Sequence, residues 1–276
     1  MKPQKIPKGE KMKKLLVSLL ASAFVLFGTG AVFAAGLTYD GSTTIGENIM
    51  PDAAKLFTEK TGIKFDKIGG LGSGKGFKMV MEGSIDIGGV SRALSIEEKR
   101  LKPYYQIVGY DAIAVFINEK NPVKSLSKEQ VKGIFTGKIT NWKEVGGEDA
   151  SIVVITEIKT GGRATIQEFK DSALDGGEFG PSIEIDRPHD CVKRVGVEIN
   201  GITHASLAFI QPGAKTVLYN NVEPTSKNVR SGAYILSRPL NIVAKTMPKG
   251  ELKKFFDFML SPEGQAIVAE NFVPVR

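Results

Sequence analysis

Strand-like and helix-like segments alternate along nearly the whole chain, and this alternation restricts the fold more than any other feature of the sequence. Apolar runs at residues 85–90 (IDIGGV) and 110–118 (YDAIAVFIN) predict strands, whereas residues 47–62 and 163–174 have the periodicity of helices. Repeated strand–loop–helix units build mostly parallel, doubly wound sheets. Such sheets bind ligands at the carboxyl ends of their strands, where loops meet the N-termini of helices.

Two long β-type runs, residues 110–118 and 234–245, link two α/β sets. We therefore expect an α/β protein with two lobes, each a mixed, mostly parallel sheet flanked by helices, joined by crossover strands. Lobe I is predicted to contain residues 35–112 and about 240–276, and lobe II about 113–239.

The N-terminus has the pattern of a secretory signal peptide. Basic residues precede an apolar run at residues 15–27, and Val32–Ala34 form a small-residue cleavage box. The run is too short for a spanning helix, which is the alternative interpretation. Residues 1–34 are thus predicted to be removed, with residues 1–11 an upstream start artefact. We expect a periplasmic protein without stable membrane insertion after cleavage.

Most of the basic charge lies in that leader. Removal of residues 1–34 takes away six lysines and one glutamate, which lowers the formal net charge from +7 to +2. The remaining charge does not indicate a nucleic-acid partner. Cys191 is the single cysteine, so an internal disulfide is excluded.

The stretch IGGLGSGKGF, residues 68–77, has the glycine content of a phosphate-binding loop. Gly69, Gly74 and Lys75 fit the pattern G-x-x-x-x-G-K-[ST], but Gly76 replaces the hydroxyl residue that would bind magnesium. A nucleotide loop is therefore not expected. Two interpretations remain: a flexible glycine turn, or a turn whose amides bind an anion at a helix N-terminus.

Similar loops recur after other predicted strands. Residues 40–46 contain Ser42, Thr43 and Thr44; residues 88–94 contain Ser91 and Arg92; residues 159–169 contain Thr160, Gly161, Gly162 and Arg163. A single Ser or Thr before a helix is usually only an N-cap. Four such loops in the same context favour an anion-binding cleft.

Signals for catalysis are weak. His189 and His204 are the only histidines and lack metal-ligand spacing, and no G-x-S-x-G elbow occurs. We expect no enzyme activity, no catalytic residue, no metal and no cofactor. A secreted phosphoester hydrolase is the alternative from another functional class.

Seven segments together resemble the phosphate-binding proteins of bacterial phosphate ABC importers, a family with the type II periplasmic binding protein fold. They are GSTTIG, GLGSGKGF, GSIDIGGVSR, YDAIAVFIN, SLSKEQVKGIFTGKITNWKEVGG, SRPL and LSPEGQAIV, in order over nearly the whole mature chain. The resemblance implies a monomer whose lobes close on an oxyanion, inorganic phosphate in this family, and deliver it to an ABC importer permease. A binding protein for another oxyanion, or a sensor or scavenger, has the same fold.

The resemblance also implies the binding residues. In the first lobe they are Thr44, the Ile45 amide, Ser73 and Asp86, with Ser42, Thr43, Ser91 and Arg92 as further contacts; in the second they are Thr160, Gly161, Gly162 and Arg163. Asp86 would accept a hydrogen bond from a protonated anion oxygen and so favour hydrogen phosphate over sulfate.

The second lobe departs from the family pattern. Thr156 stands where the family has a phosphate-binding arginine, and residues 159–162 (KTGG) replace Gly-Ser-Gly-Thr. The loss of one fixed charge and one hydroxyl predicts weaker phosphate binding or a different oxyanion. Arg163, Lys159, Lys75 and Arg92 are the cations that could compensate.

Overall fold

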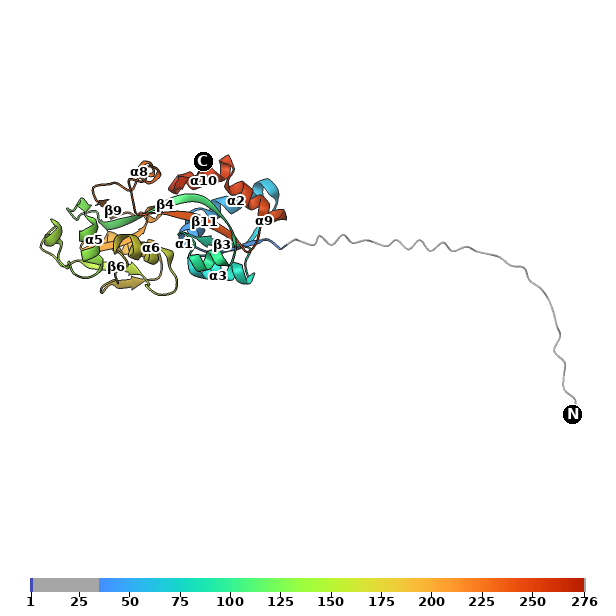
Figure 1. Ribbon diagram of the computed structural model, residues 1–276, viewed down its shortest axis with the longest axis horizontal. Coiled ribbons are helices and arrows are strands. Elements are labelled where there is room, and N and C mark those ends of the chain that lie inside the picture. The colour runs from blue at the N-terminus through green and yellow to red at the C-terminus, as the bar shows by residue number, and fades with distance from the viewer. Residues whose placement is uncertain (2–34, 276) are drawn as a thin grey trace. The chain divides into compact units, whose positions relative to one another are not determined.

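The structure is a computed structural model that describes residues 35–275 and, before them, only Met1 (Figure 1). The predicted signal peptide lies outside the described residues. Residues 35–276 form one compact unit. Within the described part of the chain, no helix has the length and apolar character needed to cross a membrane.

The strands are β1 (Leu37–Gly41), β2 (Phe65–Ile68), β3 (Ile87–Val90), β4 (Tyr104–Asn118), β5 (Ser125–Leu126), β6 (Val153–Glu157), β7 (Ile183–Ile185), β8 (Gly201–Ser206), β9 (Ala214–Thr216), β10 (Leu218–Tyr219), β11 (Ser237–Ala244) and β12 (Val273–Pro274). The helices are α1 (Thr43–Asn48), α2 (Met50–Thr61), α3 (Ser73–Glu82), α4 (Ile96–Arg100), α5 (Lys128–Phe135), α6 (Ala164–Ala173), α7 (Pro188–Val197), α8 (Ser226–Arg230), α9 (Gly250–Met259) and α10 (Pro262–Asn271), with 3-10 turns η1 (Trp142–Val145) and η2 (Leu207–Phe209).

The main sheet has the order β2-β1-β3-β11-β4-β8-β6-β7, and β9 and β12 also pair with β4. Strands β1, β2 and β3 pair in parallel, as do β6, β7 and β8. The long strands β4 and β11 pair antiparallel to each other, and β4 continues beyond β11 to pair with β8. This mixed, mostly parallel arrangement agrees with the predicted fold class.

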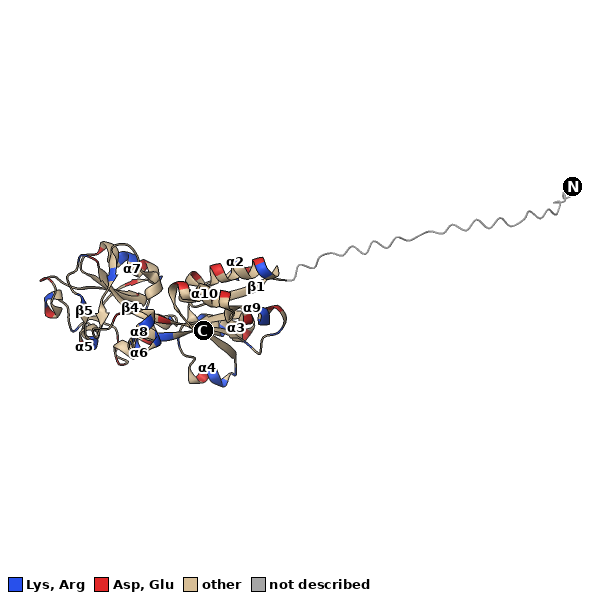
Figure 2. Ribbon diagram, turned by 90° about the horizontal axis from the view of Figure 1, so that it is seen from above, with Lys and Arg blue, Asp and Glu red and all other residues tan. Residues whose placement is uncertain are grey.

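The two parallel sets define two halves with separate cores, which β4 and β11 connect (Figure 1). In the first half, α2, α9 and α10 cover one face of β1–β3 and α3 covers the other. In the second half, α5 and α6 pack on one face of β8 and β6, and α7 packs on the opposite face. Acidic and basic side chains are interspersed on outer helices such as α2 and α4 (Figure 2). The lobe boundaries predicted from the sequence remain a prediction.

The glycine-rich segment is partly helical, which differs from the predicted loop. Helix α3 already begins at Ser73, so residues 73–76 form its first turn. Position 76 requires a glycine, because a Cβ there would lie 2.3 Å from the Cα of Gly41. The absent side chain lets α3 pack directly on the end of β1 and brings Ser73 next to that strand's carboxyl end.

Candidate functional site

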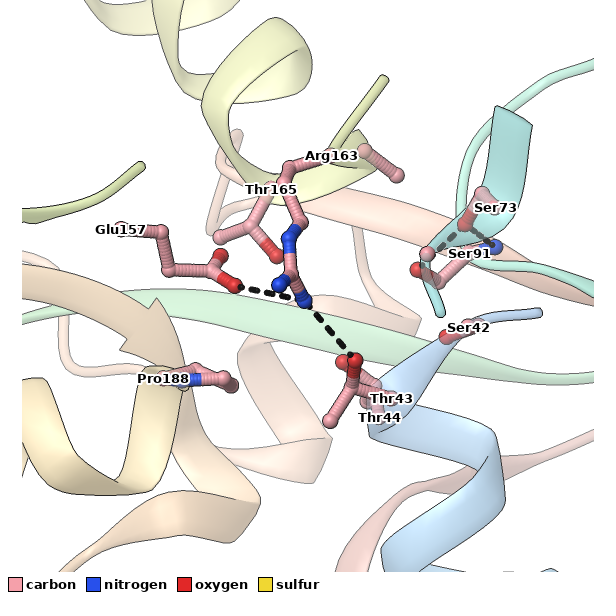
Figure 3. A pocket seen from close by; sticks show the side chains of 11 residues that line it. Ser42, Thr43, Thr44, Ser73, Ser91, Glu157, Arg163, Thr165 and Pro188 are labelled. Atoms are coloured by element: carbon pink, nitrogen blue, oxygen red, sulfur yellow. Dashed lines mark hydrogen bonds and ion pairs between the residues drawn. The ribbon is translucent and has the colours of Figure 1, made fainter. Parts of the chain in front are cut away.

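A small polar pocket lies where the first turns of α1, α3 and α6 come together (Figure 3). Its lining residues come from both halves of the molecule. They are Ser42, Thr43, Thr44, Gly72, Ser73, Ser91, Glu157, Arg163, Ala164, Thr165 and Pro188. The cavity volume is about 10 Å³, close to the space of one water molecule. The pocket in this form therefore has no room for a sugar or a peptide.

The first half contributes a set of hydroxyl groups, which we call the hydroxyl wall: Ser42, Thr43, Thr44, Ser73 and Ser91. All five side chains are buried. Ser73 Oγ accepts a hydrogen bond from the Ser91 backbone N–H at 3.1 Å and lies 3.4 Å from Ser91 Oγ. Because a hydroxyl hydrogen rotates, these groups can turn their donors toward an anion.

Strand ends and helix starts place the hydroxyl wall at the pocket. Ser42 follows β1 and caps α1, with its Oγ accepting from the Ile45 backbone N–H at 3.3 Å. Ser73 is the first residue of α3, and Ser91 directly follows β3. The unpaired amides and the dipole of a helix N-terminus favour negative charge. The hydroxyl wall is thus an uncharged surface suited to an anion.

The second half contributes a surface of different chemistry, which we call the charged wall: Glu157, Arg163, Thr165 and Pro188. Glu157 ends β6, Arg163 is the N-cap of α6 and Pro188 opens α7. Arg163 Nη1 reaches across the pocket to Thr43 Oγ1 at 3.4 Å and lies 3.8 Å from Glu157 Oε1 (Figure 3). The Arg163 guanidinium therefore bridges the two walls.

A second guanidinium lies beneath both walls. Arg238, on β11, is fully buried and donates from Nε to Asp111 Oδ2 at 2.9 Å. Its Nη1 donates to Thr165 Oγ1 at 3.0 Å and its Nη2 to Thr44 Oγ1 at 3.1 Å. Ser206 Oγ donates to Asp111 Oδ1 at 2.7 Å. Arg238 thus ties one threonine of each wall to the strands that connect the halves.

Burial strongly affects both carboxyl groups near the pocket. It raises the pKa of Glu157 to about 7, although the nearby guanidinium groups of Arg163 and Arg238 oppose the rise. Burial also raises the pKa of Asp111, against the opposing effects of Arg238 and the Ser206 hydroxyl. Charge in this region is therefore poorly solvated, and each charged group depends on its partners.

The structure brings together six of the residues expected to bind the ligand. Ser42, Thr43, Thr44, Ser73, Ser91 and Arg163 all line the pocket. The Ile45 side chain is instead buried in the core of the first half, and its amide is engaged by Ser42.

Asp86 requires a correction. It immediately precedes β3, is exposed, and accepts hydrogen bonds from the Thr38 backbone N–H at 2.9 Å and Thr38 Oγ1 at 2.7 Å. The pocket lies at the carboxyl end of β3, at Ser91. Asp86 and Ser91 are separated by five residue steps, which at roughly 3.3 Å each place Asp86 about 16 Å away along the strand. The structure does not place this carboxylate in the pocket.

Three further expected residues lie beside the pocket or outside it, and so does Arg92. Thr160 and Gly161 are exposed and do not line it. Gly162 lines a larger neighbouring cavity, and its carbonyl accepts from the Gly74 N–H at 3.3 Å. Arg92 lines that neighbouring cavity too, where it forms a two-pronged ion pair with Glu98 at 2.7 Å.

The residues at which the sequence departs from the family pattern, and two of the cations that could compensate, lie outside the pocket lining. Thr156 is fully buried, and its Oγ1 lies 2.9 Å from Ser182 Oγ, away from the lining residues. Lys75 is exposed and Lys159 contacts Glu184 at 3.3 Å, so neither supplies charge to the pocket lining. Of the four candidate cations, Arg163 is the one that lines it.

Sequence reasoning missed Glu157, Thr165, Arg238 and Asp111. Glu157 had the same signal as the recognised loops, since it ends the β-type run SIVVITE at residues 151–157. Arg238 stands inside the apolar run 234–245, and a charge within a buried strand needs a partner. The identity of that partner was not available from local sequence.

Comparisons with known proteins agree with this arrangement. Residues 34–263 match a family model described as a PBP superfamily domain. The phosphate-binding protein PstS of Bacillus subtilis is 28% identical over an alignment that covers 96% of this chain and 95% of the relative.

Two solved structures have the same fold. One is a Clostridium perfringens substrate-binding protein, assigned to phosphate ABC transport and solved with bound phosphate; it is 35% identical, with a TM-score of 0.82, over 87% of this chain and 100% of that one. The other is an ABC-type phosphate transport receptor from Vibrio cholerae, 26% identical with a TM-score of 0.72 over 85% and 98%. These matches confirm the resemblance and the type II fold class predicted from the sequence, and the family model covers most of the chain. The chain belongs to the PBP superfamily of binding proteins.

Proposed function

We propose that this chain captures inorganic phosphate in the periplasm and delivers it to the permease of an ABC importer. The observation on which the proposal rests is the pocket itself, where hydroxyls at the first turns of helices from both halves meet the Arg163 guanidinium. Charge-assisted hydrogen bonds of this kind are about twice as strong as neutral ones. The phosphate-binding names of the relatives support the same ligand.

The pocket lies between the halves, so ligand capture is coupled to their approach. Contacts that already join them include Gly74 N–H to the Gly162 carbonyl, Arg163 to Thr43, and an ion pair between Arg187 and Glu47. A tetrahedral oxyanion is larger than one water molecule, so its binding requires the Arg163 guanidinium to move from Thr43 onto the anion. The differential affinity of the closed form for the anion then drives closure.

Arg163 also answers the question raised by Thr156. The second half lacks the arginine that the family has at that position, yet it still presents one guanidinium, from the N-cap of α6. A planar guanidinium binds two oxygens of a tetrahedral anion at once. We therefore propose phosphate as the ligand, with another tetrahedral oxyanion as the alternative of the same chemistry.

Isothermal titration calorimetry of the purified protein with phosphate, arsenate, sulfate and molybdate tests this proposal. Phosphate and arsenate should bind with similar affinity, because they have the same shape and protonation. If millimolar phosphate released no binding heat and did not compete with any of the other three anions, phosphate would not be the ligand. Gel filtration with light scattering tests the predicted monomer, and co-purification with the permease tests the proposed partner.

A further inference from the structure

Glu157 is an unusual group to find in an anion pocket. Among the lining residues that the structure describes it is the one carboxylate, and only 3% of its side chain is exposed. An ionised carboxylate next to a bound anion in such a poorly solvated place is strongly unfavourable. The negative charge of Glu157 must therefore be neutralised when an anion binds in the pocket.

The groups that face Glu157 do not neutralise it fully. The Arg163 guanidinium, from the N-cap of α6, lies 3.8 Å away, beyond hydrogen-bond distance, and forms a closer ion pair with Asp186. The Arg238 guanidinium, from β11, is committed to Asp111. Asp186 opposes ionisation of Glu157, and from α7 the uncharged, buried Cys191 thiol adds no positive charge. The first-half residues that line the pocket are all uncharged.

We propose that Glu157 and the bound oxyanion together hold one proton, in a hydrogen bond between a carboxyl oxygen and an anion oxygen. Phosphate brings this proton itself, because at pH 8 it is mostly the hydrogen-bearing dianion. Sulfate has no proton at this pH, so it binds only when the Glu157 carboxyl has taken one from solvent. Glu157 therefore determines specificity, in a role that the sequence assigned to Asp86. The inference rests on the proposed function.

The two anions then depend differently on pH. Burial gives the free Glu157 carboxyl a pKa of about 7, and a nearby anion raises the pKa further. Above this value, sulfate binding must take up about one proton, so its affinity falls about tenfold for each pH unit. Below pH 7 the carboxyl is already protonated, and the sulfate affinity levels off. Selectivity for phosphate is thus lost on acidification.

The experiment measures sulfate and phosphate affinity by calorimetry at pH 6, 7, 8 and 9 with the wild-type protein. Sulfate itself does not titrate in this range, so any pH dependence belongs to the protein. We expect its Kd to rise about tenfold per unit above pH 7. At pH 8, the sulfate heat should also vary with the ionisation enthalpy of the buffer as expected for uptake of one proton, whereas phosphate should take up none.

The Glu157→Gln variant should flatten the sulfate pH profile, because an amide neither needs nor takes up a proton. Glu168→Gln is the matched control, since Glu168 lies on α6 and lines the neighbouring cavity rather than the pocket. That control should retain the steep wild-type profile. Thermal melting checks that both variants are folded, and the wild-type series decides the question if Glu157→Gln does not fold.

The outcomes separate the two proposals. Failure of phosphate to bind at every pH overturns the phosphate function. If phosphate binds while the wild-type sulfate Kd does not change with pH, only the role of Glu157 is wrong. That role is equally wrong if sulfate fails to compete at pH 6 even at high millimolar concentration.

Discussion

The two walls of the pocket differ in chemistry and in how the chain builds them. The hydroxyl wall consists of short, uncharged side chains at the ends of β1 and β3 and the starts of α1 and α3, held by the Ser42 cap and by the bond between Ser73 and Ser91. The charged wall presents a buried carboxyl and a long guanidinium whose contacts come from distant parts of the chain. The difference indicates that the hydroxyl wall supplies shape and hydrogen-bond donors. We expect the charged wall to supply most of the electrostatic affinity and selectivity.

The largest change, a loss of stability, is expected at Arg238, which contacts both walls. Arg238→Met removes the guanidinium that donates to Thr44 and Thr165 and leaves Asp111 buried without its counter-charge. Loss of one partner of a buried ion pair costs about 3–5 kcal/mol of stability. Urea unfolding measures this change. The double variant Arg238→Met with Asp111→Leu should recover much of the loss, and a double variant no more stable than the single one would contradict the explanation.

The second prediction compares charge in the charged wall with charge outside it. Arg163→Gln removes the guanidinium that lines the pocket, and a hydrogen bond to a charged group is worth about 1.5–3 kcal/mol, which corresponds to roughly a 10- to 150-fold loss of phosphate affinity. Lys75→Ala, the control, removes an exposed charge of the first half and should leave the affinity within about twofold. Equal losses in the two variants would remove the distinction between the walls.

The third prediction concerns the core behind the charged wall. His204 is fully buried, and its ring stacks on Phe169 of α6 with the ring centroids 3.9 Å apart. Neither ring nitrogen has a hydrogen-bond partner among the residues that the structure describes. Burial and the charge of Arg238 lower its pKa to about 3. Below about pH 6.5 the His204 ring binds a proton in the unfolded chain but not in the folded chain. The free energy of unfolding therefore decreases as the pH falls, and at pH 5 this group has lowered it by about 2 kcal/mol.

His204→Phe isolates this effect. The substituted ring cannot be protonated, so the free energy of unfolding should lose less on acidification from pH 7 to pH 5 than in the wild type. Urea unfolding at both pH values measures the difference. A wild-type protein and variant with identical pH profiles would show that His204 is not the titrating group.

The contrast between the walls also explains what the sequence could reveal. Ser42 and Ser73 were recognisable because a hydroxyl residue between a strand and a helix has a local signature. The Asp111–Arg238 pair joins residues 127 positions apart, and Arg163 contacts Thr43 across 120 positions. Contacts of this range depend on the tertiary arrangement of the two halves.

Asp86 shows a different failure. The motif SIDIGG was recognised as a strand, but the carboxylate stands before that strand, whereas the pocket forms after it. In a parallel set, chain direction alone places such a residue at the opposite edge of the sheet. The direction of the strand was therefore enough to exclude it, and the same rule would have identified Glu157, which ends β6.

The smallest effects are expected in the first half, where one pair of variants separates the hydroxyl wall from its surroundings. Ser73→Ala removes a hydroxyl from the pocket and the acceptor of the Ser91 N–H. A neutral hydrogen bond contributes about 0.5–1.5 kcal/mol, so phosphate affinity should fall roughly 2- to 13-fold. Asp86→Asn should leave that affinity unchanged, because the carboxylate accepts hydrogen bonds from Thr38 of β1 and lies at the end of β3 away from the pocket.

Calorimetry with phosphate and sulfate at pH 8 measures both variants. If Ser73→Ala weakened phosphate more than Arg163→Gln, the hydroxyl wall would supply most of the affinity, and the proposed division between the walls would be wrong. If Asp86→Asn admitted sulfate at pH 8, the carboxylate that rejects sulfate would belong to the first half after all. Selectivity that changes with Glu157→Gln and not with Asp86→Asn would assign the rejection of sulfate to the charged wall, through the one carboxyl group among the described residues that line the pocket.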